Sequence, residues 1–145
     1  MTYENSTTDY SVSVASSTGD TSNFENWWKA FNMDYKDGYW DNCGFTLSYY
    51  PDSDSGMNFE TFINMYPGNV ITSLWFDQEG GTWIPEGWTV VIDTGFEQIQ
   101  LDNYNLPYYD NPLEFTTPTE TVRFIWTQVS SWDSPTVFGI QFLWK

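Results

Sequence analysis

The titratable side chains of this 145-residue chain limit the chemistry that it could perform. The sequence contains no histidine and one cysteine, Cys43, against twenty aspartate and glutamate residues. Histidine is the usual base near neutral pH, and nucleophilic hydroxyl or thiol groups normally need such a base beside them. Zinc sites built on imidazole are excluded for the same reason. Any catalysis would therefore have to use carboxylates alone, as glycoside hydrolysis does.

The carboxylates do not by themselves indicate an active site. Among twenty acids, some pair will lie at a separation that suits glycoside hydrolysis, so the presence of a pair is uninformative. Cys43 lies in "DNCGF", where no sequence feature supplies a base, and we interpret it as a packed thiol. We predict that the chain is not an enzyme. A carboxylate-only glycosidase is the alternative, which turnover of an oligosaccharide panel would reveal.

Aromatic residues that stand in polar loops are the candidates for ligand binding. Nine Trp, ten Tyr and eleven Phe are present, and several lie among Asp, Asn, Ser and Pro, where the core cannot easily reach them. A flat ring can stack on a sugar face while polar neighbours accept the hydroxyl protons. The alternative is that these rings pack against neighbouring loops or another subunit. The candidates are Trp132 in "SSWDSP", Tyr108 and Tyr109 in "NLPYYDNP", and Tyr49 and Tyr50 before Pro51.

The elements that position these residues are predicted to be short strands. Segments rich in β-branched and aromatic residues alternate with clusters of Gly, Pro, Asn and Asp, which is an all-β pattern. The segment "FENWWKAF" could form at most a turn or two of helix. The predicted strands are "GFTLSYY", "NFETFINMY", "VITSLWF", "WTVVID", "EQIQL", "TVRFIWTQV" and "FGIQFLW". Their number suits a two-sheet sandwich or jelly roll.

One predicted strand, "TVRFIWTQV", has apolar residues on both faces. Successive side chains of a strand point to opposite faces, so the segment divides into two sets. The sets are Val122, Phe124 and Trp126 on one face, and Arg123, Ile125 and Thr127 on the other. We therefore expect a central strand.

The length of the chain fits one domain. Residues 1–23 are rich in Ser, Thr, Asn and Asp, and we expect a polar lead-in with one short edge strand at "YSVSVAS". The sandwich domain is predicted to span residues 24–145.

Charge and apolar content restrict the partners. The net charge of −16 repels phosphate backbones and anionic headgroups, so we expect no nucleic-acid partner. The sequence has no run of eighteen apolar residues, so we expect no membrane insertion. A single cysteine and an N-terminus without the order of a secretory signal favour synthesis in the cytoplasm.

Three segments resemble discoidin-like domains, which are also called coagulation factor type C or galactose-binding-like domains. The segment "ETVRFIWTQVSSWDSPTVFGIQFLWK" is similar to the family's closing strand, loop and strand. Upstream, "SSTGDTSNFENWWKAFNMDYKDGYW" resembles its opening segment, and "WIPEGWTVVIDTG" resembles its hairpin. The segments follow the family's order and cover most of residues 15 to 145. The resemblance implies a discoidin-like jelly-roll β-sandwich.

The resemblance also implies roles for the opening segment. In the family, a phenylalanine and a tryptophan plug one end of the sandwich, and the polar loop between them often holds calcium. The plugs would be Phe31 and Trp40. The oxygen donors of the loop would be Asn32, Asp34 and Asp37. This chain departs from the family's pattern, which has an acid in place of Asn32, a glycine in place of Met33 and a glutamate in the last strand. We therefore expect no obligatory cofactor, and calcium is the one candidate.

Discoidin-like domains occur in phage tail and capsid-surface proteins and in carbohydrate-binding modules. A sandwich made in the cytoplasm without secretion fits a virion, because phage particles assemble inside the host and leave by lysis. The sequence therefore predicts a non-catalytic virion surface component, either a capsid decoration or an adhesion module on a tail or fibre. Its partners would be other virion proteins, further copies of itself or a host-surface glycan. The alternative is a carbohydrate-binding module of a secreted bacterial enzyme or adhesin, which would act outside the cell.

For a virion component we also expect a particular surface arrangement. Thirty aromatic residues exceed what a core of this size can hide, and exposed aromatic patches commonly mark contact sites. The exposed rings should gather on one face, with the acids on the opposite face.

Overall fold

The computed structural model describes residues 2–6, 9–16, 44–46, 58–76, 84, 86–128, 136–138 and 140–144. These residues form strands and turns and contain no helix, which confirms the predicted all-β class. The strands are β1 (Thr2–Ser6), β2 (Tyr10–Ser16), β3 (Gly44–Thr46), β4 (Asn58–Met65), β5 (Ile71–Phe76), β6 (Trp88–Asp93), β7 (Gln98–Leu101), β8 (Leu113–Thr119), β9 (Thr121–Gln128), β10 (Thr136–Phe138) and β11 (Ile140–Trp144). The described part of the chain holds no long apolar helix of the kind that crosses a bilayer.

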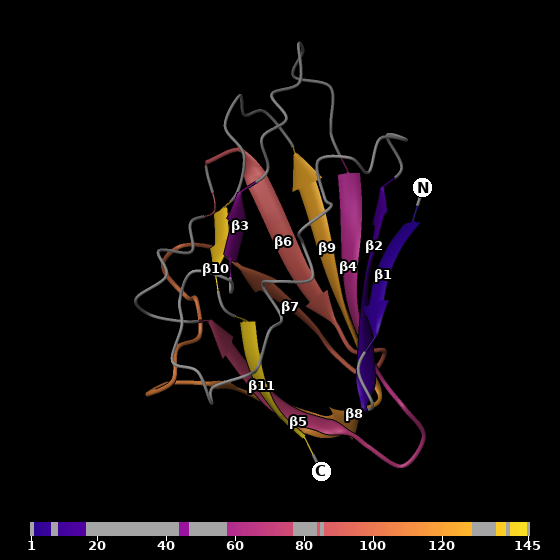
Figure 1. The fold of residues 1–145 in the computed structure, drawn as a ribbon. Helices are drawn as coiled ribbons and strands as arrows, with labels where there is room; N and C mark the ends of the chain where they lie inside the picture. Colours follow the sequence, from indigo (N-terminus) through magenta and orange to yellow (C-terminus); the bar gives the residue numbers. More distant parts are fainter. Residues whose placement is uncertain are drawn as a thin grey trace.

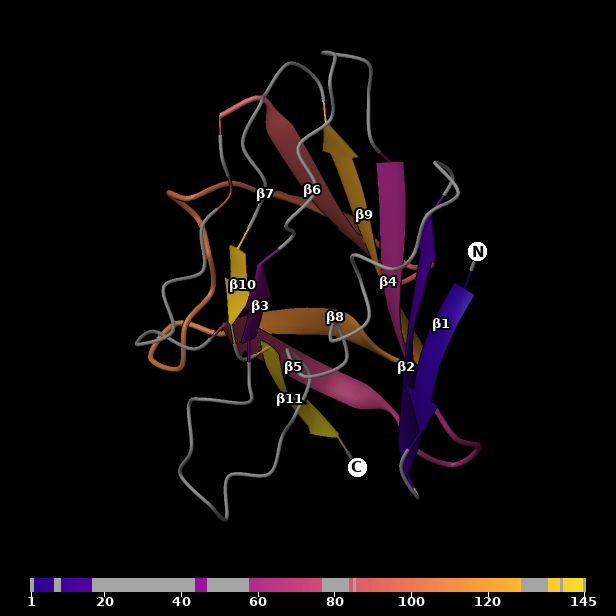
Figure 2. The same cartoon turned by 45° about the horizontal axis from the view of Figure 1, so that its top comes forward.

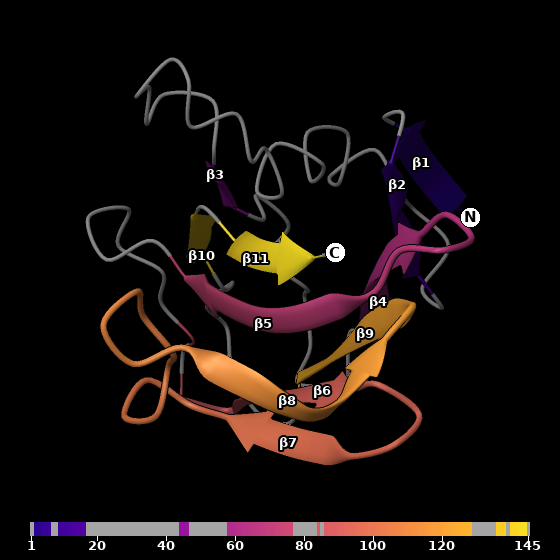
Figure 3. The same cartoon turned by 90° about the horizontal axis from the view of Figure 1, so that it is seen from below.

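Two antiparallel sheets form a sandwich. The larger sheet has six strands in the order β1-β2-β4-β9-β6-β7, and the smaller has three in the order β11-β5-β8. The strands β3 and β10 form a separate antiparallel pair. Figures 1 and 2 show β1, β2, β4, β9 and β6 side by side, with β5 and β11 crossing below them. Figure 3, from below, shows β5 and β8 lying across the large sheet.

The core lies between these two sheets because alternate residues of each strand point inward. In β9 the side chains of Val122, Phe124 and Trp126 are fully buried, and the intervening residues are half-buried. As β9 pairs with β4 on one side and β6 on the other, the prediction of a central strand is confirmed. The smaller sheet supplies further buried side chains, among them Phe76 from β5 and Phe142 from β11.

Specific contacts close both sides of the sandwich. On one side the ring of Tyr10 in β2 packs edge-on against Phe142 in β11, with centroids 5.0 Å apart. The second and last strands of the chain thus lie near each other. On the other side the Thr119 hydroxyl donates to the carbonyl oxygen of Thr94 or Thr121, 3.2 and 2.9 Å away. The hydrogen bond to Thr94 places the end of β8 beside the β6–β7 turn.

The N-terminal segment differs from its prediction. The strand within "YSVSVAS" is present as β2, but it lies between β1 and β4 and is not an edge strand. The buried side chain of Val12 belongs to the same core as β9. The sheet therefore begins at Thr2, upstream of the expected start near Phe24. The segment "TYENS" has little strand propensity of its own, and pairing along β2 supplies the hydrogen bonds.

The sequence pattern also missed β8. This strand, "LEFTTPT", carries Pro118, and a proline argues against a central strand. The structure places β8 at the edge of its sheet, where a missing N–H is tolerated. Glu114 pairs with Ser73 and Thr119 pairs with Ile71, so four residues of β8 lie opposite one residue of β5. Pro118 is one of these four and therefore lies in a bulge.

Candidate functional site

The candidate site is the β7–β8 loop, residues 102–112, which joins the edge strands of the two sheets. The loop carries three tyrosines in eleven residues and is anchored to β5 and to Ile84, which lies between β5 and β6. The Phe76 N–H at the end of β5 donates to the carbonyl oxygen of Pro107 at 2.8 Å. The side chain of Asn103 accepts from the backbone N–H of Ile84 at 2.8 Å and donates to its carbonyl oxygen. These bonds fix a surface loop that would otherwise be free to move.

The first half of the loop is a turn built by Asp102. Its carboxylate accepts the backbone N–H groups of Tyr104 at 2.8 Å and Asn105 at 3.1 Å. The Asn105 side chain accepts from the Asp102 N–H at 2.6 Å and donates to the carbonyl oxygen of Gln100 at 2.9 Å. Such Asx turns replace the backbone bonds of a hairpin. Tyr104 stands at the tip with 98% of its surface exposed.

The second half is a tight hairpin turn. Tyr108 and Asn111 exchange both backbone hydrogen bonds, at 3.2 and 2.9 Å, so two residues form the tip. One of them, Tyr109, is 73% exposed, and its ring stands edge-on to the buried Trp75 ring, with centroids 5.8 Å apart. That contact orients the ring while leaving most of its surface open.

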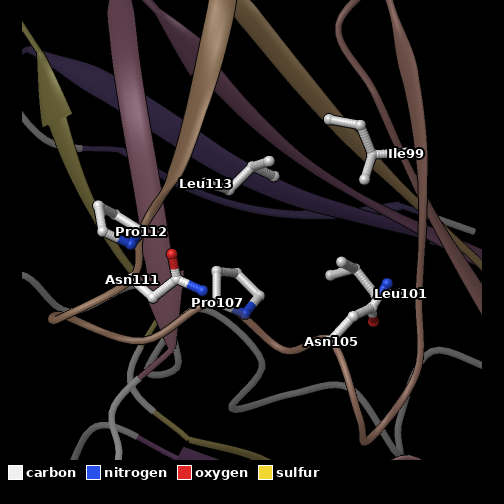
Figure 4. A pocket seen from close by; sticks show the side chains of 7 residues that line it. All are labelled: Ile99, Leu101, Asn105, Pro107, Asn111, Pro112 and Leu113. Atoms are coloured by element: carbon white, nitrogen blue, oxygen red, sulfur yellow. The ribbon is translucent and has the colours of Figure 1, made fainter.

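A pocket lies behind these turns, between the edges of the two sheets. Its volume is about 160 Å³. Figure 4 shows its lining: Ile99 and Leu101 from β7, Leu113 from β8, and Asn105, Pro107, Asn111 and Pro112 from the loop. The lining is mixed: five apolar side chains contribute to it together with polar atoms, among them those of the two asparagines.

Acids and rings are interleaved in the loop. Asp102 and Asp110 are both exposed and lie within two residues of Tyr104 and Tyr109, respectively. The expected separation of rings from acids onto opposite faces of the molecule stays a prediction. The exposed ring of Phe96 also lies elsewhere, in the β6–β7 turn at the other end of β7.

The best-defined charged cluster lies apart from the loop. On the outer face of the large sheet, the Arg123 guanidinium donates to the Glu60 carboxylate, and its Nη1 lies 3.9 Å from Asp93 Oδ2. The hydrogen bond to Glu60 raises the pKa of Arg123, and this effect is larger than that of burial, which lowers the pKa. This cluster links side chains of β4, β9 and β6.

The sequence-predicted residues fall in three groups. Tyr108 and Tyr109 lie in the loop, but Tyr108 is half-buried and packs against the core, whereas Tyr109 is exposed. The ligand candidates Trp132, Tyr49 and Tyr50 lie outside the described residues. So do the proposed plugs Phe31 and Trp40 and the calcium candidates Asn32, Asp34 and Asp37. Within the described ranges, no three acids or cysteines gather where they could hold a metal ion.

Sequence reasoning did not select Tyr104, Asn105 or Asn111. The segment "DNYNLP" carried a usable signal, because Asp and Asn around one tyrosine are typical of an Asx turn with a ring at its tip. Asn111 gave no such signal, since its place at the pocket follows from the packing of β7 against β8.

No known protein family, no curated protein and no solved structure matches this chain. The resemblance to discoidin-like domains accordingly stays a prediction, and the site rests on the geometry of its own residues.

Proposed function

We propose that this chain is a non-catalytic adhesion module on the surface of a phage virion and that it binds a glycan through the β7–β8 loop. The observation that carries the proposal is the pair of exposed rings, Tyr104 and Tyr109, on one anchored loop. The backbone of both residues is fixed by the loop's hydrogen bonds, and the ring of Tyr109 is also oriented by Trp75. A loop fixed before binding loses little conformational entropy on contact with a ligand. The jelly-roll form of the sandwich is part of the same proposal.

The neighbouring acids favour a hydroxyl-rich ligand. Asp102 and Asp110 are exposed and lie within two residues of the rings, and carboxylate oxygens accept hydrogen bonds from sugar hydroxyls. A polypeptide partner with an apolar docking face would meet these charges on contact and would have to desolvate them. The interleaved arrangement therefore favours adhesion over capsid decoration.

The second candidate is the carbohydrate-binding module of a secreted bacterial enzyme or adhesin. The same loop would serve it, so the two functions differ in where the protein acts and not in how it binds. Immunogold electron microscopy of particles released by lysis separates them. Label on a tail or fibre supports the virion function, label on the capsid shell supports decoration, and unlabelled particles favour the secreted module.

Glycan binding is tested with a glycan array, followed by calorimetry on the glycan that binds best. Replacing Tyr104 or Tyr109 with alanine should weaken binding about threefold to tenfold each, because one aromatic contact contributes about 0.5 to 1.5 kcal/mol. Phe96→Ala is the matched control, since this ring is 67% exposed and lies outside the loop. Equal loss in all three variants, or no binding to any glycan, would contradict the proposal.

Stability provides a second control. Tyr104 is almost wholly exposed, so Tyr104→Ala should change the free energy of unfolding by less than about 0.5 kcal/mol. A loss of binding without a loss of stability then reports on the contact surface itself.

A further inference from the structure

The pocket behind the β7–β8 loop has the size of one small ring or substituent. The pocket opens to solvent, and its volume of about 160 Å³ is similar to that of an enclosed protein cavity of about 150 Å³ that accepts benzene. It is smaller than the pockets of about 300 to 1,000 Å³ that hold drug-sized molecules. An oligosaccharide can therefore place only one group in it, with the remainder lying over the loop.

The lining indicates an apolar group that carries a polar attachment. Ile99, Leu101 and Leu113 form the inner wall, and two prolines complete it (Figure 4). None of these five side chains offers a hydrogen bond, so a bare hydroxyl gains nothing from contact with them. A methyl group, by contrast, gains from leaving water.

The rim carries one free hydrogen-bonding side chain. The Asn105 amide is used by the Asp102 turn, through its bonds to the Asp102 N–H and the Gln100 carbonyl oxygen. The Asn111 side chain makes no hydrogen bond with any other described residue, although its backbone is fixed by Tyr108. In Figure 4 its amide group points toward Pro107, another residue of the lining. It offers donors and an acceptor to a group that enters the pocket.

We infer that this pocket receives the acetamido group of an N-acetylated hexosamine, an inference that rests on the proposed glycan-binding function. The acetamido methyl packs against Leu101 and Leu113, and the Asn111 amide donates to the acetamido carbonyl oxygen. Tyr104 and Tyr109 stand on the same loop, where they contact the neighbouring sugar faces. The pocket thus selects the sugar class, and the rings add affinity.

Matched pairs of monosaccharides test this selection on the full chain. N-acetylglucosamine is compared with glucose, and N-acetylgalactosamine with galactose, by NMR titration. We expect the acetylated member of each pair to bind at least about tenfold more tightly, since it adds a buried methyl and a hydrogen bond. Saturation-transfer difference spectra should show the largest signal on the acetamido methyl protons.

Two variants locate the effect. Asn111→Asp keeps the shape but removes the donor, so it should reduce the preference for the acetylated sugars to the roughly fourfold that a buried methyl group alone contributes. Asn69→Asp adds the same charge in the β4–β5 turn, away from the pocket, and should leave the preference unchanged. Leu113→Phe fills the pocket from β8 and should abolish the preference, with circular dichroism reporting whether the fold is retained.

The outcomes separate this inference from the proposed function. Equal affinity for both members of each pair, with binding still lost in Tyr104→Ala, overturns the acetamido assignment and leaves glycan adhesion standing. A preference for 6-deoxy sugars over acetamido sugars also overturns the assignment. Absence of binding to any glycan overturns both.

Discussion

Removal of the Asn103 side chain should loosen the anchor of the β7–β8 loop. This side chain makes two hydrogen bonds to the backbone of Ile84, nineteen residues away in sequence, and Ile84 is 4% exposed. Each such bond contributes about 0.5 to 1.5 kcal/mol net, so Asn103→Ala should lower the free energy of unfolding by about 2 kcal/mol. For a chain of this length the melting temperature should fall by about 8 °C.

The assay combines calorimetric melting with amide hydrogen exchange. In Asn103→Ala the Ile84 amide should exchange faster, because its acceptor is gone. Asn69→Ala is the control, since that side chain makes no hydrogen bond with another described residue, and its melting temperature should stay within about 2 °C of the wild type. An unchanged melting temperature in Asn103→Ala, together with unchanged exchange at Ile84, would refute the anchoring argument.

Three further outcomes are expected. Trp126→Ala, at the centre of the core, should cost about 3 to 5 kcal/mol in urea unfolding, and a cost below about 1 kcal/mol would contradict the central position of β9. Arg123→Met should cost about 1 kcal/mol or less, because 40% of that side chain is exposed and solvent screens the pair. The pKa of Arg123 is raised in the folded state, so the stabilisation by its charge is fully present below the unfolded-state pKa and is lost only in strong alkali. The loss of stability in Arg123→Met should therefore be equal at about pH 6 and pH 9. Millimolar calcium should raise the melting temperature only slightly, and a rise above about 8 °C, roughly 2 kcal/mol, would show a complete metal site.

Much of the strand content could be predicted because its signal is local. The segment "WTVVID" alternates in sequence, and β6 buries Trp88, Val90 and Ile92 in the same alternation. The apolar residues on both faces of β9 likewise predicted its central place. The local signal failed at β1 and β8, where partner strands supply the hydrogen bonds or the edge position tolerates Pro118.

The candidate site was only partly predictable. Tyr108 and Tyr109 have the same local surroundings in "NLPYYDNP", yet one ring packs on the core and the other is exposed. The direction of the turn that begins at Tyr108 decides between them, and that turn is set by packing against β5. The proposed role of Asn111 depends on the pocket between β7 and β8. The spacing of residues in the sequence does not predict this pocket, because it forms only when the two strands pack together.

The sequence by itself determined the class of chemistry and the class of fold. The absence of histidine and the excess of acids limit the reactions available, and short alternating apolar segments indicate strands, since both properties belong to residue types and their spacing. Only the tertiary structure decided which rings stay exposed, which strands form the edges and where the pocket lies. These features depend on contacts between residues far apart in the chain, such as Ile84 with Asn103 and Phe76 with Pro107. Burial of one shared core brings such residues together.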